Sequence, residues 1–153
     1  VVVEAWPAWF LMENVMGAPV PIVPGYYRKP YVITDVHVGG ATRRKRVFTF
    51  GRQQEDCGLF IEWAALHTTQ PAPTVLASNG GPLRKIVNGG GGAIKANAES
   101  LPVMIERQGL PPDFLSSAPF TVAGKIKCVG NGVPLPMGRA IARAVRKAMS
   151  PMP

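Results

Sequence analysis

The residues with the clearest chemical potential in this chain are one carboxylate in an apolar stretch and one run of four cations. Glu13 directly follows Phe10-Leu11-Met12, and Arg43-Arg44-Lys45-Arg46 runs into Val47-Phe48-Thr49-Phe50 without a break. A carboxylate at the carboxyl end of a buried strand in an α/β sheet lies where ligands bind, although a solvated acid at a strand end is the ordinary alternative. Four adjacent cations are often a solvated tract or a localisation signal, but such tracts are disordered. This run therefore favours binding of phosphate groups or bases.

A third suggestive stretch, Lys127 to Pro136, reads Lys-Cys-Val-Gly-Asn-Gly-Val-Pro-Leu-Pro. Gly130 and Gly132 flank Asn131, and glycine and asparagine are the residues that best tolerate positive φ. The pattern predicts a tight loop that can approach another group closely, although it could equally be a connecting turn with no functional role. The two prolines that follow stop any strand, and the second suits the first turn of a helix.

The charge of the chain favours a polyanionic partner. Its 153 residues include 17 Lys and Arg against 9 Asp and Glu, a net charge of +8. Nucleic acid is the first candidate and an anionic membrane surface the second. No apolar run approaches the roughly 18 residues of a spanning helix, so we expect no membrane partner. The length corresponds to about one domain, and 46% hydrophobic residues exclude a disordered chain.

The cysteines and histidines predict no metal site. Cys57 and Cys128 share no Cys-x-x-Cys spacing, and His37 and His67 stand apart from both of them, so neither a zinc site nor a disulfide can be argued. The chain begins Val1-Val2-Val3, without an initiator Met or the features of a secretory signal. We therefore expect that upstream sequence is missing.

Periodicity predicts the elements that must hold these motifs. With period two, Arg44, Arg46, Phe48 and Phe50 share one face of their strand. In the last helix, apolar residues recur at spacings of three and four, and arginines and a lysine take the opposite face. The glycine-rich Asn88 to Gly92 has no phosphate-loop spacing and is expected to be a loop. The expected elements are a strand within 1–15 that is buried on both faces and has a short helix or turn at 4–7, strands at 31–38 and 43–50, and helices at 58–66, 101–107 and 137–149.

Four stretches stand in a fixed order that resembles the C-terminal half of the DNA (cytosine-5) methyltransferases. The family's Glu-Asn-Val motif is intact, and its Gln-x-Arg-x-Arg motif has Thr42 in the first position. Its Gln-Gly-Phe-Pro motif has Leu110 in place of Phe, and its Gly-Asn-Ala-Val-Pro motif has Gly132 in place of Ala. A Pro-x-x-Thr-Ile stretch of the family resembles Pro71 to Val75, so the resemblance covers nearly the whole chain. The four stretches are Glu13-Asn14-Val15, Thr42-Arg43-Arg44-Lys45-Arg46, Gln108-Gly109-Leu110-Pro111 and Gly130-Asn131-Gly132-Val133-Pro134.

The resemblance implies a role for each matching residue. Methylation of carbon 5 needs a thiolate to attack carbon 6 of cytosine, and a carboxyl group at N3 makes the ring a better electrophile. Glu13, with Asn14 beside it, matches that carboxyl position, and a carboxyl group in an apolar site holds its proton more readily. Arg44 and Arg46 match the cations that hold the backbone around a flipped nucleotide, within a DNA-binding run formed by Arg43, Arg44, Lys45 and Arg46. Asn131, Gly132 and Val133 would lie by the S-adenosylmethionine pocket.

The fold implied by the resemblance is α/β: the C-terminal half of a Rossmann-like S-adenosylmethionine-dependent methyltransferase domain with a reduced target-recognition segment. Residues 1–50 would be the second half of the catalytic sheet, 51–100 a small target-recognition and loop region, and 101–153 the return to the catalytic domain. The implied partners are double-stranded DNA and the missing N-terminal half, from the same gene or a separate subunit. Met137, Ile141 and Val145 would pack against that half. The expected location is the bacterial or phage cytoplasm, in association with DNA.

Two parts of the family pattern do not occur. The Pro-Cys nucleophile motif and the Phe-x-Gly-x-Gly cofactor loop precede Glu-Asn-Val in the family, and neither is present in this sequence. Cys57 follows Asp56 and Cys128 follows Lys127, so neither matches the nucleophile. We therefore expect no methyl transfer by this chain alone. The alternative is a non-catalytic, basic DNA-binding protein, either a relic or the partner subunit of a split methyltransferase.

Overall fold

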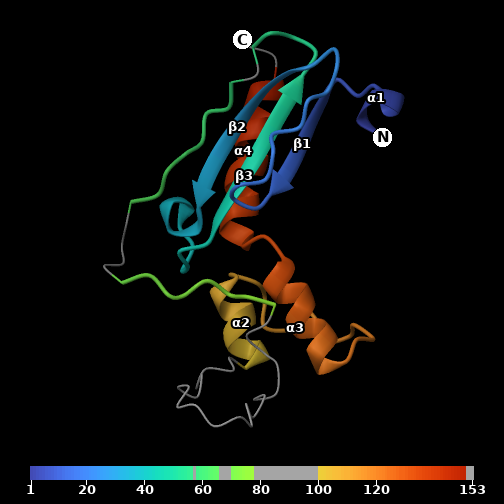
Figure 1. The fold of residues 1–153 in the computed structure, drawn as a ribbon. Helices are drawn as coiled ribbons and strands as arrows, with labels where there is room; N and C mark the ends of the chain where they lie inside the picture. The colour runs from blue at the N-terminus through green and yellow to red at the C-terminus, as the bar shows by residue number, and fades with distance from the viewer. Residues whose placement is uncertain (57, 66–69, 78–99, 151–153) are drawn as a thin grey trace, which may run out of the picture.

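Three strands form an antiparallel sheet in which the last strand of the sequence lies in the middle. The strands are β1 (Trp9–Asn14), β2 (Tyr27–Thr34) and β3 (Lys45–Arg52), in the order β1-β3-β2. This computed structural model describes residues 1–56, 58–65, 70–77 and 100–150. Because both outer strands are antiparallel to β3, they run in the same direction and end at the same edge of the sheet (Figure 1).

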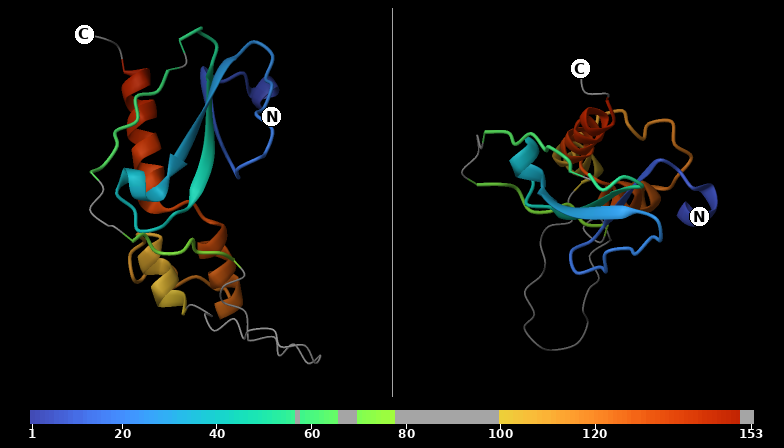
Figure 2. Two further views of the ribbon diagram at one scale, coloured as in Figure 1. Left: turned by 60° about the vertical axis from the view of Figure 1, so that its left-hand side comes forward. Right: turned by 90° about the horizontal axis from the view of Figure 1, so that it is seen from above.

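One long helix covers one face of this sheet. Helix α4 (Leu135–Met149) lies along the strands, and Figure 2 shows it on a single side of the sheet. Its apolar stripe faces Ile33, Phe48 and Phe50, and its basic residues point outward. The predicted helix and its two faces are confirmed. The buried residues of α4 are Met137, Ala140, Ile141, Ala144 and Val145.

The expectation that Met137, Ile141 and Val145 pack against an absent half is wrong. All three lie in the core between α4 and the chain's own sheet. The cations of the central strand β3 stand at its two ends, so the middle of that strand offers an apolar surface to the helix stripe.

A pair of short helices lies beyond one end of the sheet. Helices α2 (Leu101–Arg107) and α3 (Val122–Asn131) enclose a second small core. In Figure 1 this pair lies at the end where β1 and β2 finish and β3 begins. Helix α2 has the predicted bounds. The buried residues of the second core are Val75, Met104, Ile105, Ile126 and Val129.

The first predicted strand is shorter and less buried than expected. Residues before Trp9 form α1 (Val2–Ala5), and Trp6 adopts a left-handed conformation just before Pro7, which ends any strand pairing there. Strand β1 is not buried on both faces, because Phe10 alone of its six residues is buried. The short helix or turn expected at 4–7 is confirmed in outline.

Two further segments differ from their predicted form. The end of the second strand is a 3-10 helix, η1 (Asp35–Val38), because Asp35 folds back to accept hydrogen bonds from Thr42. No helix forms over residues 58–65, where the chain is extended and buries Leu59 and Ile61 alternately. The loop predicted at 88–92 lies outside the described residues.

The mixed α/β class is confirmed in this form, a small antiparallel sheet followed by helices. No two neighbouring strands of the described sheet run parallel, so the parallel sheet of a Rossmann-like domain is not seen. In the same ranges, no helix is long and apolar enough to cross a membrane.

Candidate functional site

The candidate residues gather at the edge of the sheet where β1 and β2 end. Glu13 is the penultimate residue of β1, and Arg44 and Arg46 flank the start of β3. Because β3 runs in the opposite direction, its first residues lie beside the last residues of its neighbours. The carboxyl edge of two strands therefore carries both the carboxylate and the arginines.

Glu13 forms an ion pair with Arg46. The two atoms Oε1 and Nε lie 2.7 Å apart, and the side chains are 35% and 15% exposed. The Nε–H of Arg46 does not point at the oxygen, so the contact is electrostatic and not an aligned hydrogen bond. Nη1 of Arg46 instead donates to the carbonyl oxygen of Lys45 at 2.9 Å. The apolar surroundings expected for Glu13 are not found, because its carboxylate is partly exposed and beside a cation.

Arg44 is buried, in contrast to its neighbour in the motif. It is 2% exposed, and its Nη1 donates to the carbonyl oxygen of Val75 at 2.6 Å. Burial, and then the nearby charge of Arg46, lowers its pKa to about 10, against the opposing effects of Glu13 and Asp35. Its buried Nε has no hydrogen-bond partner among the described residues. Arg44 therefore holds the segment that contains Val75 against the sheet.

Asp35 is a buried carboxylate beside Arg44 that the sequence reasoning did not single out. Its Oδ2 accepts hydrogen bonds from the backbone N–H of Thr42 at 3.0 Å and from the Thr42 hydroxyl at 2.7 Å. Burial raises the pKa of Asp35, and the two hydrogen bonds and the charge of Arg44 only partly offset this effect. Gly40 lies against the same carboxylate, since a Cβ there would come within 1.9 Å of Oδ1.

Thr42 occupies the position where the resembled motif has Gln. Its side chain is buried and is held by Asp35, so it sets the geometry of the turn that leads to Arg44. Arg43 and Lys45 alternate in sequence with the buried Thr42 and Arg44, and both are exposed. Asn14 lies at the end of β1, and its side-chain oxygen accepts the N–H of Val15 at 2.9 Å. The alternation leaves Arg43 and Lys45 directed toward solvent, where phosphate groups are accessible.

The stretches that begin at Gln108 and at Gly130 are also in contact with each other. Gln108 is buried, and its Nε2 donates to the carbonyl oxygens of Val129 at 2.7 Å and Gly132 at 3.5 Å. The backbone N–H of Leu135 donates to the Gln108 carbonyl oxygen at 2.9 Å. Gly109 has a φ of 67° and lies against Pro136. The turn after α2 therefore packs on the turn that leads into α4, and only glycine adopts this conformation there without strain.

The loop predicted around Asn131 is partly wrong. Helix α3 continues through Asn131, and none of Gly130, Asn131 and Gly132 has a positive φ. The predicted close approach does occur, because a Cβ on Gly130 would lie 2.3 Å from the backbone nitrogen of Ala77. Gly130 therefore allows α3 to touch the segment that Arg44 also holds.

The residues expected at the cofactor differ in their exposure. Asn131 is exposed, and Gly132 and Val133 are partly buried. Val133 packs on the core between the sheet and α4.

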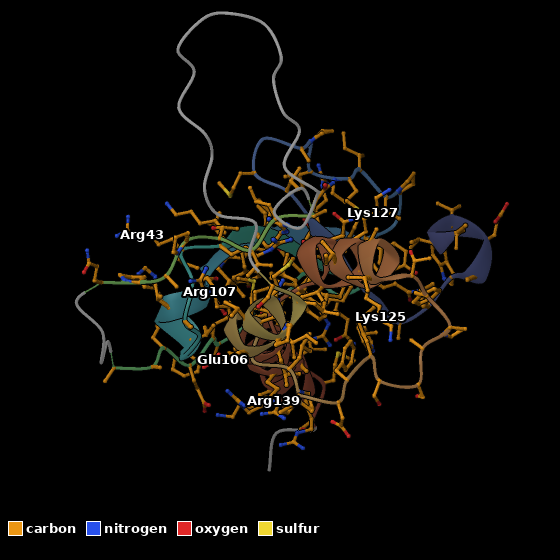
Figure 3. All side chains as sticks on the ribbon, turned by 90° about the horizontal axis from the view of Figure 1, so that it is seen from below. Arg43, Glu106, Arg107, Lys125, Lys127 and Arg139 are labelled. Atoms are coloured by element: carbon orange, nitrogen blue, oxygen red, sulfur yellow. The ribbon has the colours of Figure 1, made fainter. Side chains whose placement is uncertain are left out.

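Basic side chains surround this end of the molecule: Arg43, Lys127 and Arg139 are exposed, and Arg107 and Lys125 are partly buried. Viewed from below, Arg43, Arg107, Lys125, Lys127 and Arg139 lie around the helix pair and the start of α4, with Glu106 among them (Figure 3). They come from four separate segments, so the sequence run at 43–46 was only one part of a wider basic surface. Arg107 and Arg139 lie on helices that the sequence predicted, whereas Lys125 and Lys127 lie on α3, which it did not predict.

The described residues include a free thiol and no cluster that could hold a metal ion. Cys128 is an exposed free thiol on α3, and Cys57 lies outside the described residues. No group of three or more histidine, cysteine, aspartate or glutamate side chains in these ranges is placed to hold a metal ion.

A hollow in the surface lies apart from the candidate residues. It is lined by Tyr31 and by residues 59–63, on the β2 side of the sheet. In comparisons with known proteins, the sequence matches no model of a protein family and no curated protein.

Proposed function

We propose that this chain is the C-terminal part of a DNA (cytosine-5) methyltransferase and that it acts with an upstream half supplying the thiolate and the main cofactor loop. The observation that carries the proposal is the convergence of five separate segments of the chain. Glu13 contacts Arg46, Gln108 contacts Gly132, and the segment around Val75 contacts both Arg44 and α3. These are the stretches whose order resembles the family.

The two arginines have different roles in this proposal. Arg44 is buried and fixes the segment around Val75, so it positions its neighbours and does not reach a phosphate directly. Arg46 is partly exposed and, with exposed Arg43 and Lys45, holds the phosphates around a flipped cytosine.

Glu13 then acts on N3 of the flipped cytosine. In the structure the Glu13 carboxyl group is held by its contact with Arg46. A DNA phosphate that binds Arg46 would compete for the guanidinium and release Glu13. In this proposal DNA binding frees the carboxyl group to contact N3 of the cytosine.

The experiment that tests the proposal is reconstitution. The chain is combined with the polypeptide encoded immediately upstream, and transfer of a labelled methyl group from S-adenosylmethionine to duplex DNA is measured. Transfer that needs both polypeptides, and that is lost when cytosines are replaced by thymines, is the expected result. An upstream sequence without a Pro-Cys motif, or a pair that transfers no methyl group, contradicts the proposal.

A non-catalytic DNA-binding role is the second candidate, and the packing of α4 favours it. Because Met137, Ile141 and Val145 are buried within the chain, the sheet and helix have their own core without another half. The basic surface at the lower end would then bind duplex DNA alone (Figure 3). Titration with duplex DNA at several salt concentrations tests this role, since phosphate contacts give an affinity that falls steeply with salt. Absence of binding at low salt removes it.

A further inference from the structure

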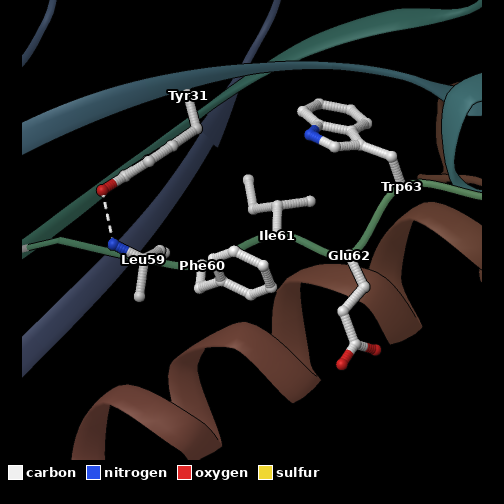
Figure 4. A pocket seen from close by; sticks show the side chains of 6 residues that line it. All are labelled: Tyr31, Leu59, Phe60, Ile61, Glu62 and Trp63. Carbon is white, nitrogen blue, oxygen red and sulfur yellow. Dashed lines mark hydrogen bonds between the residues drawn. The ribbon is translucent and has the colours of Figure 1, made fainter.

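A hollow between β2 and α4 is separate from the candidate site and has a different chemical character. It has a volume of about 530 Å³ and is lined by Tyr31, Leu59, Phe60, Ile61, Glu62 and Trp63. It lies on the side of β2, whereas Glu13 is on β1, the opposite outer strand. Figure 4 shows Tyr31, Phe60 and Trp63 around it, with α4 passing below.

The floor of the hollow is fixed to the rest of the molecule. Leu59 and Ile61 are buried and belong to the core under α4. The backbone N–H of Leu59 donates to the Tyr31 hydroxyl oxygen at 2.6 Å, and the N–H of Ala64 donates to the His37 carbonyl oxygen at 2.8 Å. The segment between these two hydrogen bonds therefore presents its outward side chains from an ordered backbone.

The outward side chains are large aromatic rings left open to solvent. Phe60 is 73% exposed and Trp63 is 58% exposed, although rings of this size are usually covered. The ring of Trp63 contacts His37 edge to face, with centroids 6.0 Å apart. Two exposed rings therefore border one hollow, and each offers a face on which a planar group can stack.

Cations stand over the rings at the rim of the hollow. Nζ of Lys147 lies 6.0 Å from the centroid of Phe60, and Nζ of Lys29 lies 5.7 Å from that of Tyr31. The acid in the lining, Glu62, is paired with Lys147, and its Oε2 lies 3.8 Å from Nε of Arg143. Two cations therefore face one carboxylate, and the rim keeps a net positive charge. The occupant that matches this rim is planar and anionic.

We propose that this hollow binds single-stranded nucleic acid, with bases stacked on Phe60 and Trp63 and phosphates near Lys29, Arg143 and Lys147. Aromatic platforms beside cations bind single strands with little sequence preference, because every base has a π face. An apolar or proline-rich peptide would use the rings but not the cations, so the charge of the rim favours the nucleic acid. The inference does not rest on the proposed methyl transfer.

The test uses the full chain and two cytosine-free probes, fluorescein-labelled oligothymidine and oligouridine, followed by fluorescence anisotropy. We expect both probes to bind to the original chain. Phe60→Ala and Trp63→Ala should each weaken binding about tenfold. Added salt should also weaken the binding of the original chain. Phe120→Ala is the matched control, because Phe120 is an exposed ring on the loop before α3 and should change nothing. Circular dichroism confirms that each exposed-residue variant folds.

The outcomes separate the possible occupants. Tighter binding of one probe identifies DNA or RNA as the natural source of the strand. No binding at low salt, an equal loss in Phe120→Ala, or binding of a proline-rich peptide in preference to both probes overturns the inference. Because neither probe contains cytosine, failure of methyl transfer in the reconstituted pair leaves this result intact, and the reverse also holds.

Discussion

Nε of Arg46 lies 2.7 Å from Oε1 of Glu13, at the edge where β1 ends and β3 begins. The two residues are far apart in sequence and meet because β3 is antiparallel to β1 and lies beside it. Glu13 is opposite Phe48 in the register, so Arg46 reaches it diagonally on the same face. The pairing of β1 with β3 therefore brings the carboxylate of Glu13 and the guanidinium of Arg46 into contact.

The first prediction concerns Glu13 in the reconstituted enzyme. Glu13→Gln keeps the size of the side chain but cannot act as a general acid, and we expect methyl transfer to fall about 10²-fold or more, the usual scale for loss of a general acid. The measurement is the rate of labelled methyl transfer to duplex DNA. Glu4→Gln, an exposed acid on α1, is the control and should keep the full rate. An undiminished rate in Glu13→Gln would remove its assigned role.

The second prediction separates Arg44 from its neighbour. Arg44→Met leaves the Val75 carbonyl oxygen without its charged donor and Asp35 without its neighbouring cation, so we expect a loss of about 2 kcal/mol in the free energy of unfolding. Arg43→Met removes an exposed side chain and should change it by less than about 0.5 kcal/mol. Urea denaturation measures both. Equal effects of the two substitutions would show that Arg44 does not hold the segment around Val75.

The buried faces of the elements that carry the candidate residues could be predicted from the sequence, because the patterns that reveal them are local. Period two placed Arg46, Phe48 and Phe50 on one face, and the observed register does the same. The helix stripe from Met137 to Val145 has enough turns to reveal its buried side. Local patterns of this kind report which face of an element is buried, and they do so without knowledge of the partner.

The remaining features depend on contacts that no local pattern contains. Asp35 looked like part of a strand, but its hydrogen bonds with Thr42, seven residues later, curl the chain into η1. Residues 59–61 have the composition of a helix and are extended because the groove between β2 and α4 accepts alternate side chains. The glycines around Asn131 suggested a turn, whereas Gly130 serves a close contact within a helix. Tertiary packing overrides propensity in each case.

The third prediction follows from the raised pKa of Asp35. The folded state binds this proton more tightly than the unfolded state, so it holds more protons at any pH between the unfolded value of about 3.8 and the folded value. The contribution of Asp35 to stability is then greatest at low pH and is lost as pH rises through the folded pKa. Asp35→Asn has no such proton and keeps an oxygen that can accept the Thr42 N–H. We expect the variant to lack this fall in stability.

Urea denaturation at a series of pH values checks the Asp35 prediction. The difference in unfolding free energy between Asp35→Asn and the original chain should change with pH in the acid range and become constant above the folded pKa. Asp113→Asn, an exposed acid between α2 and α3, is the control and should follow the original chain. A difference that does not vary with pH would mean that burial of Asp35 does not raise its pKa.

The fourth prediction compares two glycines in neighbouring helices. A Cβ on Gly130 would lie 2.3 Å from the backbone nitrogen of Ala77 and 2.4 Å from its Cα, so Gly130→Ala must push α3 away from this segment. We expect a loss of about 1–3 kcal/mol in the free energy of unfolding, as for other overpacked sites. Gly138, within α4, has no atom within 4 Å of its built Cβ, so Gly138→Ala should stabilise the chain by about 0.5–1 kcal/mol. Urea denaturation of the two variants decides the matter: if Gly130→Ala stabilises as Gly138→Ala does, then α3 does not need close contact with the segment that Arg44 holds.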